Sequence, residues 1–354
     1  MNNTVQRLLA LAAAMALAGN ATAAHDHNSH AFSAFLSAEA DFASTTTGGR
    51  DEEIDAVADV IFSHQAGRWR LLGELVLSPD EHEMERVQLG YEVADNTIIW
   101  LGRFHQPSSV WNVFYHHGQF LQTSITRPAM EEWEDEHGFL PQHIVGGMVE
   151  SFIPTAGADA WRISVSTGLA PRIEPLELEP FVPFQKEGAD FTHASARLEW
   201  LPDALGEDVI GLVASTTRMR RDGSLTASPV TLRTAGLFAN LGTDRVRALG
   251  NVMLLHTKGS TQAGLEFRNH VSAYLQLEAE ARSDITLFAR QELLTNVRNS
   301  AYLAELTRPP ARRTVVGARA QFGLRNALSV ELSRSRFPGS TRRDLRLQWS
   351  AAFP

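Results

Sequence analysis

The sequence predicts an all-β fold, an antiparallel transmembrane β-barrel of about 16 strands, on three observations. Apolar and polar residues alternate along segments of about 10–12 residues, the length that a tilted strand needs to cross a bilayer. The connections between these segments alternate between short and long, as in barrels that have turns on one side of a membrane and loops on the other. No stretch of 18 or more apolar residues occurs, which excludes a polytopic helical membrane protein.

The composition excludes several classes of protein. The 354 residues include no cysteine, so a disulfide framework, a cysteine-ligated metal and a thiol nucleophile are all ruled out. The formal net charge of −9 disfavours a nucleic-acid partner, because bulk electrostatics would repel the phosphate backbone. We therefore expect no nucleic-acid binding.

The N-terminus reads as an export signal. Arg7 precedes an apolar run from Leu8 to Ala18 that is too short to span a bilayer, and the small residues of 21–23 end it. We therefore expect residues 1–23 to be a cleaved signal peptide, residues 24–31 a histidine-rich tail and residues 32–354 the barrel. An exported chain of this kind is expected in the cell outer membrane.

The last strand shows the alternation most clearly. Its apolar face carries Leu345, Leu347, Trp349, Ala351 and Phe353, and its polar face carries the residues between them. An α-helix would scatter these apolar residues around its circumference, whereas a strand places them on one side. The same pattern occurs in 32–42, 67–77, 270–282 and 314–325.

The connections set the strand count. Short turns are expected near 66–67, 95–96, 154–159, 202–207, 242–243, 283–284 and 325–326. Longer loops are expected at 44–52, 79–84, 106–142, 169–191, 219–229, 257–263, 294–313 and 338–342. A soluble β-sandwich is the alternative, but its strands would be shorter, about 5–6 residues on average. The density of arginine and glutamate on the polar faces suits a water-filled lumen better.

Two segments resemble the porin superfamily of Gram-negative outer membranes. The terminal strand DLRLQWSAAF, 344–353, is similar to the signal by which such barrels are recognised for assembly, although Pro354 follows it. The segment 102–146 contains GRFHQPSSVWNVFYHHGQFLQTSITRP and EEWEDEHGFLPQHIVG and resembles porin-like proteins of unassigned substrate. The resemblance implies a passive channel that contacts outer-membrane lipid and the barrel-assembly machinery, and it implies a homotrimer.

The third long loop, 106–142, is the longest connection, and connections of this length are usually functional. In porins the third loop folds into the barrel and narrows the pore, so the resemblance implies a constriction here. The loop holds five carboxylates within six positions, which repel one another unless cations or arginines compensate: Glu131, Glu132, Glu134, Asp135 and Glu136. These carboxylates either form a charged constriction or a solvated acidic lip on the cell surface.

Other residues are expected to share the constriction with these carboxylates. The alternation directs Arg68, Arg70 and Arg103 to the lumen, where charge sets ion selectivity. Tyr115, His116 and His117 lie in the loop itself and can pack it against the inner wall. The alternative for the arginines is that many pair with glutamates across strands and stiffen the wall.

Histidines suggest a metal-binding alternative. His25, His27 and His30 lie close together near the expected mature N-terminus, where imidazoles and a free amine bind Cu(II), Ni(II) or Zn(II). The alternative is a flexible tail with incidental affinity. Five further histidines surround the third loop and, with its carboxylates, would form a divalent-metal gate: His105, His116, His117, His137 and His143.

The functional prediction is passive diffusion of small hydrophilic solutes or ions through the barrel, with no cofactor. Enzyme motifs such as GxSxG, the P-loop and HExxH do not occur in the sequence, and we expect no catalytic residues. Three alternatives stay open. One is a barrel that binds or takes up divalent metal through the tail and the third loop. The others are an enzyme with its site at the rim and a structural barrel plugged by the third loop.

Overall fold

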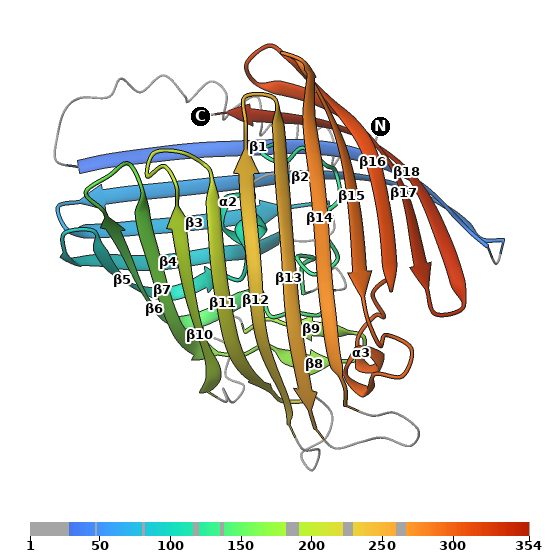
Figure 1. Ribbon diagram of the computed structural model, residues 1–354, viewed down its shortest axis with the longest axis horizontal. Coiled ribbons are helices and arrows are strands. Elements are labelled where there is room, and N and C mark those ends of the chain that lie inside the picture. The colour runs from blue at the N-terminus through green and yellow to red at the C-terminus, as the bar shows by residue number, and fades with distance from the viewer. Residues whose placement is uncertain are drawn as a thin grey trace.

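The computed structural model describes residues 28–46, 48–79, 82–115, 120–134, 138–181, 191–221, 229–259 and 267–353. Sixteen strands of the described chain form one closed barrel, and each pairs antiparallel with both neighbours (Figure 1). This architecture confirms the predicted fold and the predicted strand count. The barrel strands are β1 (Asn28–Thr45), β2 (Arg50–Ala66), β3 (Trp69–Leu77), β4 (His82–Ala94), β5 (Thr97–His105), β6 (His143–Pro154), β7 (Ala160–Leu169), β10 (Phe191–Leu201), β11 (Val209–Met219), β12 (Val230–Gly242), β13 (Val246–Lys258), β14 (Asn269–Arg282), β15 (Ile285–Leu294), β16 (Arg312–Phe322), β17 (Asn326–Phe337) and β18 (Ser340–Phe353).

The first and last strands close the barrel. β1 pairs with β18 from Ala34 opposite Phe353 to Thr45 opposite Arg342, and its other edge pairs with β2. In Figure 1, β1 and β2 cross the view almost horizontally, whereas β12 to β14 on the opposite wall run nearly vertically. The strands are therefore strongly tilted, as closure requires.

The outer face of the barrel is apolar. In β14, Leu275 and Leu277 point outward and are about half exposed, whereas Gln276 and Glu278 between them are buried inside. The same exposure of large apolar side chains recurs on the outer faces of β5, β12, β13, β15 and β17. Such a band would be unfavourable in water and suits hydrocarbon, where a closed barrel satisfies every backbone group. Among the helices that the structure describes, none is long and apolar enough to cross a membrane.

The connections separate into two ends, as predicted. Seven short turns lie at one end, where β1 starts and β18 finishes, and the longer connections lie at the other. The long loops expected at 44–52, 79–84 and 338–342 are shorter than predicted, because the strand ends continue the pairing. β1 ends at Thr45 and β2 begins at Arg50, β3 ends at Leu77 and β4 begins at His82, and β17 ends at Phe337 and β18 begins at Ser340. β1 also begins at Asn28, before residue 32, and so includes His30.

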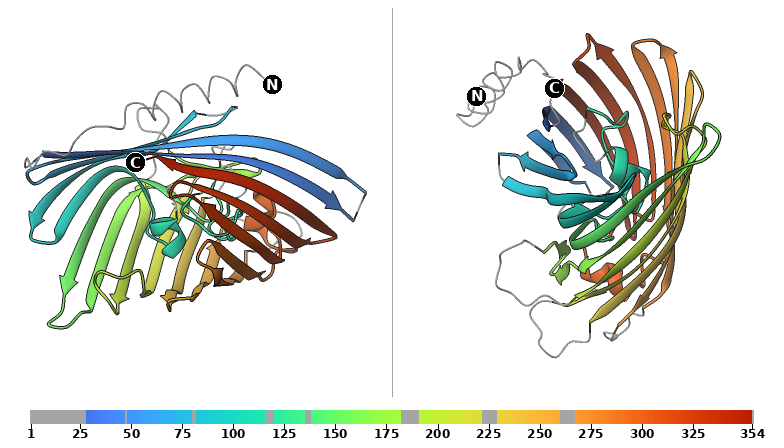
Figure 2. Two further views of the ribbon diagram at one scale, coloured as in Figure 1. Left: turned by 90° about the horizontal axis from the view of Figure 1, so that it is seen from above. Right: turned by 90° about the vertical axis from the view of Figure 1, so that its left-hand side faces the viewer.

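Three of the longer connections carry secondary structure of their own. The strands β8 (Arg172–Glu174) and β9 (Glu177–Glu179) follow β7 and pair with each other as a separate two-stranded sheet. The helix α2 (Val110–Phe114) follows β5, and α3 (Ala301–Glu305) follows β15. Figure 2 shows α2, in teal, inside the ring of strands.

Glycines allow β5, β6 and β7 to approach closely next to the third loop. Gly102, Gly146 and Gly168 lie directly opposite one another in register across these three strands. A Cβ on Gly146 would lie 2.1 Å from the carbonyl oxygen of Thr167, and one on Gly102, whose φ is +134°, would lie 2.1 Å from that of Val87. Only glycine fits this row.

Candidate functional site

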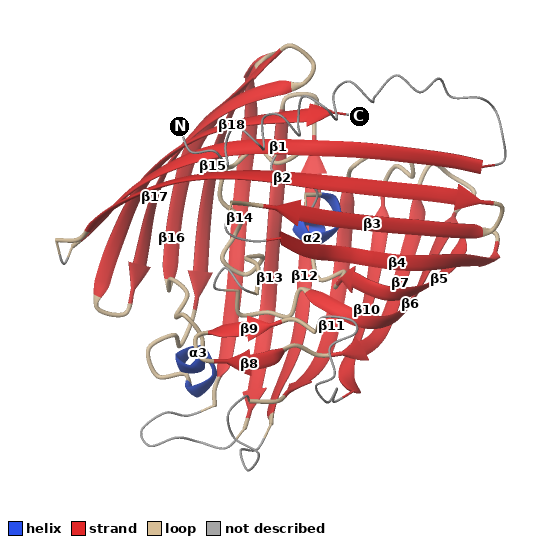
Figure 3. Cartoon of the chain, turned by 180° about the vertical axis from the view of Figure 1, so that it is seen from behind, coloured by secondary structure: helices blue, strands red, loops and turns tan. Residues whose placement is uncertain are grey.

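The described parts of the third loop, residues 106–115, 120–134 and 138–142, lie inside the barrel. Its helix α2 is adjacent to β12, and Figure 3 shows the helix between the strands of opposite walls. Ser109 caps the helix by accepting a hydrogen bond from the Asn112 backbone N–H at 3.2 Å. The loop enters the lumen because its apolar face has a partner there: Val110, Met130, Phe139 and Leu140 pack against the inward-facing Val213, Phe238, Leu249 and Met253 of β11 to β13.

Arg290 on β15 is the main polar anchor of the loop. This fully buried guanidinium donates to the hydroxyl of Ser124 at 2.8 Å, to the carbonyl of Thr126 at 2.9 Å and to the hydroxyl of Thr126 at 2.7 Å. It also donates to Gln276 at 2.9 Å and forms an ion pair with Glu292 at 2.8 Å. A planar fork with five N–H donors is suited to such a multiply bonded position.

Carboxylates of the wall hold the loop backbone. Glu331 on β17 accepts the backbone N–H groups of Ile125 at 2.9 Å and Thr126 at 3.1 Å, and Glu292 accepts that of Ala129 at 2.8 Å. Arg319 on β16 donates to the carbonyl of Gln122 at 2.7 Å. These contacts satisfy loop backbone groups that would otherwise be buried without partners. The loop is therefore fixed to β15, β16 and β17.

The helix end of the loop is fixed to other strands. Arg197 on β10 donates to the carbonyl of Ser109 at 3.0 Å, and Arg247 on β13 donates to the hydroxyl of Tyr115 at 2.7 Å. Burial raises the pKa of Tyr115 to about 12, so this phenol stays neutral at physiological pH. Tyr115 also lines the cavity between the loop and the wall.

Two of the predicted acidic residues point into the wall. Glu131 is 1% exposed, accepts a hydrogen bond from the Ser109 hydroxyl at 2.7 Å and accepts another from Asn251 on β13 at 3.2 Å. Glu134 is fully buried and contacts Nδ1 of His143 at 2.6 Å. Burial raises the pKa of Glu131 above its ordinary value, although its hydrogen-bond partners and nearby arginines oppose this shift. Both residues hold the loop in place.

Glu132 is the described loop carboxylate that faces open space. It lines a cavity of about 760 Å³ that runs between the loop and the strands β1 to β4, β17 and β18. Burial raises the pKa of Glu132 as well, against the attraction of the arginines nearby. The charged lining comprises Glu39, Asp41, Glu53, Asp55, Asp59, Glu83, Glu85, Glu132 and Asp344, with Arg127, Arg308, Arg313, Arg342 and Arg346.

Part of this lining forms ion pairs. Arg346 on β18 contacts Glu39 at 2.7 Å and Asp41 at 2.9 Å, and Arg342 contacts Asp41 at 3.0 Å. This confirms the alternative that wall arginines pair with carboxylates across strands. Glu53 and Asp55 lie opposite Asp41 and Glu39 in register, so the β1–β2 side of the cavity is predominantly acidic.

The predicted arginines occupy three different positions. Arg103 is buried and paired with Glu83, so it faces inward but is neutralised. Arg70 pairs with Glu92 at 3.5 Å, close to the short-turn end and away from the loop. The expectation for Arg68 was wrong, because the residue lies exposed in the turn between β2 and β3.

Several predicted residues lie outside the described part of the chain, namely His25, His27, His116, His117, Asp135, Glu136 and His137. His30 lies in β1, opposite His64 of β2, instead of in a tail. Asp59, Glu83 and Glu85, which line the cavity from β2 and β4, were not among the predicted residues. The available signal was the spacing of Glu83 and Glu85, two positions apart on one strand. The register of β4 against β3 shifts between Arg86 and Glu83, at a bulge.

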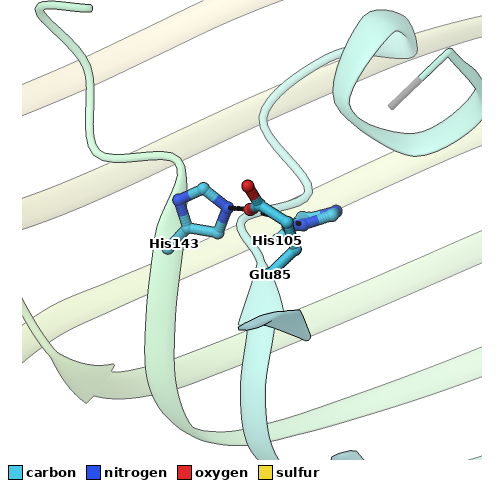
Figure 4. Close-up of side chains that lie close together, drawn as sticks. All are labelled: Glu85, His105 and His143. Atoms are coloured by element: carbon cyan, nitrogen blue, oxygen red, sulfur yellow. Dashed lines mark ion pairs between the residues drawn. The ribbon is translucent and has the colours of Figure 1, made fainter. Parts of the chain in front are cut away.

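Glu85, His105 and His143 form a compact buried cluster where the third loop joins the wall (Figure 4). One potential ligand atom from each lies within 4.8 Å of the others. Glu85 comes from β4, whereas His105 ends β5 and His143 begins β6. Trp133 of the loop stacks on His143 with ring centroids 5.4 Å apart.

Comparison with known proteins agrees with the architecture. No protein-family model and no curated protein matches the sequence. Among solved structures, the anion-selective porin from Comamonas acidovorans superposes with a TM-score of 0.62 at 11% identity, over 92% of this chain and 100% of the other. OmpF of Salmonella typhi, solved with daunomycin, gives 0.60 at 11% identity over 94% and 99%. OmpT of Vibrio cholerae, an outer-membrane protein, gives 0.58 at 10% identity over 94% and 100%. The chain therefore has the fold of the Gram-negative outer-membrane porins.

Proposed function

We propose that the protein is an outer-membrane channel through which small hydrophilic solutes or ions diffuse passively. The observation that carries the proposal is the position of the third loop, which is bonded to one side of the lumen and leaves a charged cavity on the other. A plug would be expected to contact the whole circumference. Sixteen strands are also enough to enclose an aqueous channel.

The cavity lining favours cations. The carboxylates of the lining outnumber its arginines. On the β1–β2 side of the cavity, Glu39 and Asp41 pair with Arg342 and Arg346 of β18, and Glu53 and Asp55 of β2 add two further carboxylates. Charge in a low-dielectric constriction acts on a passing ion more strongly than charge on an open surface. We therefore propose that the channel prefers cations, with Glu132 as the contribution of the third loop.

The proposal extends to assembly and environment. The apolar outer face favours contact with outer-membrane lipid, and the terminal strand favours recognition by the barrel-assembly machinery. A solved trimer form of OmpT from Vibrio cholerae superposes with a TM-score of 0.56 at 9% identity, which favours a homotrimer for this chain. Mass measurement of the detergent-extracted protein by light scattering would test the trimer.

Single-channel recording tests the function. The mature protein, purified in detergent and shown to be folded, is inserted into a planar bilayer across a KCl gradient. Discrete current steps with a reversal potential on the cation-selective side are expected. A matched variant lacking residues 109–139 should conduct more than the wild type. A silent wild type and a conducting deletion variant would instead establish a plugged barrel, and an anion-selective reversal potential would overturn the cation preference.

A further inference from the structure

We propose that Glu85, His105 and His143 form a binding site for a divalent transition-metal cation of the zinc class, which fastens both ends of the third loop to the barrel wall. This inference concerns binding and does not depend on channel activity. Two imidazoles with one carboxylate are a donor set that zinc accepts. The three side chains come from three adjacent strands, so their meeting point is a property of the fold.

The side chains are already buried and close together. His105 and His143 are 7% and 4% exposed, and Glu85 is 7% exposed. Nε2 of His143 lies 2.5 Å from Oε2 of Glu85, and Nε2 of His105 lies 3.9 Å from the same oxygen. Ligand atoms around a tetrahedral zinc ion lie roughly 3.3–3.5 Å apart, given metal–ligand distances of about 2.0–2.1 Å. Shifts of about 1 Å would therefore convert this cluster into a coordination site.

The outer contacts orient one histidine as a ligand. Glu134 accepts backbone N–H groups of Gln142 at 2.7 Å and His143 at 3.2 Å, so it is held as an acceptor beside Nδ1 of His143. A proton on Nδ1 that is donated to this carboxylate leaves Nε2 as the nitrogen that is directed at Glu85 and available to a metal ion. Carboxylates behind metal-binding histidines have this role. Nε2 of His143 and Oε2 of Glu85 are close enough to share a proton in the metal-free protein, and a metal ion would take the place of that proton.

The local charge also favours a cation. Besides Glu85 and Glu134, the carboxyl groups of Asp59, Glu74 and Glu83 interact electrostatically with this cluster. The compensating arginines are Arg86, which contacts Glu74 at 2.5 Å, and Arg103, which pairs with Glu83. Buried carboxylates in excess of cations are unfavourable, so a divalent ion lowers the electrostatic energy of this wall. Glu83 and Glu85 line the cavity, which gives an ion a route to the site.

Zinc binding by the full mature chain tests the proposal. After treatment with a chelator, the folded protein is titrated with zinc chloride in a calorimeter. One binding event is expected that His143→Gln and Glu85→Gln weaken by about 100-fold or more. Glu134→Gln should weaken it by about 10–100-fold, as loss of an outer-shell partner does. His256→Gln, which changes an exposed histidine on β13, is the matched control and should leave the dissociation constant unchanged.

Two further measurements make the result decisive. A His25→Gln/His27→Gln/His30→Gln variant separates binding at the N-terminus from binding at this cluster, and it should retain the event. Crystals of the wild type soaked in zinc should show an anomalous peak between Glu85, His105 and His143, which decides the matter even if the ligand variants fail to fold. An absent peak, or zinc binding that the N-terminal variant abolishes, would overturn the proposal and identify His143 as an imidazolium held between two carboxylates.

Discussion

Arg290 on β15 donates hydrogen bonds to both the carbonyl oxygen and the hydroxyl of Thr126, at 2.9 and 2.7 Å, although the two residues are 164 positions apart in the sequence. These two hydrogen bonds connect the barrel wall to the loop inside the lumen. Because Arg290 is fully buried and also paired with Glu292, its removal leaves several acceptors without a donor.

Replacement of this anchor should release the loop. We expect Arg290→Met to lower the free energy of unfolding by about 3–5 kcal/mol, as loss of one partner of a buried ion pair does. Single-channel conductance should change and its noise should increase. Arg282→Met is the control, because this arginine is 72% exposed and pairs with Asp284 in a short turn. Equal changes in the free energy of unfolding and in conductance for the two variants would contradict the anchoring role.

Neighbouring carboxylates should differ in their effect on selectivity. Glu132→Gln should reduce the ratio of cation to anion permeability by about fivefold or more, because one charge about 4 Å from an ion is worth about 1 kcal/mol even in water. Glu131→Gln should leave the ratio nearly unchanged, since that carboxyl group is buried between Ser109 and Asn251. Reversal potentials in a KCl gradient measure both. A larger change for Glu131→Gln would show that the assignment of the two residues is reversed.

Glu131 should make the stability of the barrel depend on pH. Burial raises its pKa in the native state, so the native state binds this proton more tightly than the unfolded state does. The resulting stabilisation is complete below the unfolded value of about 4.3 and is lost as pH rises through the raised native pKa.

Thermal unfolding between pH 4 and 9 measures this effect. The Tm of the wild type should fall relative to that of Glu131→Gln as the pH rises through this interval. Glu52→Gln replaces an exposed carboxylate on β2 and is the control, for which we expect a Tm that follows the wild type at each pH. Parallel curves for the wild type and Glu131→Gln would contradict the prediction.

The glycine row should tolerate no side chain. A Cβ on residue 146 would overlap the carbonyl of Thr167, so Gly146→Ala should destabilise the barrel by about 1–3 kcal/mol, as overpacking does. Gly73→Ala is the matched control, since its Cβ would meet only the Arg86 carbonyl oxygen at 4.0 Å, and its effect should stay within about 0.5 kcal/mol. Denaturant unfolding of the folded barrels in detergent compares them.

The strands were predictable because alternation is a local property. In β14 and β18 the polarity of the immediate neighbours shows which face each residue occupies. The count of sixteen strands followed from the short and long connections between such segments. The role of the loop carboxylates was not predictable, because it depends on partners remote in sequence. Glu131 meets Asn251 after 120 residues, and no local spacing distinguishes it from Glu132, which faces the cavity. Glu85 was missed for the same reason, since its partners at 105 and 143 become neighbours only when β4, β5 and β6 pair.

The attachment of the third loop to β15, β16 and β17 has a consequence for the order of assembly. The loop is made before its anchors, and the hydrogen bonds that hold it span 163 to 206 residues of chain. The side of the wall that bounds the cavity is completed later still, because β1 must wait for β18 to pair with it. Long-range pairings of this kind form slowly. A lumen that is still open along the seam between the first and last strands gives the loop time to enter before that seam closes.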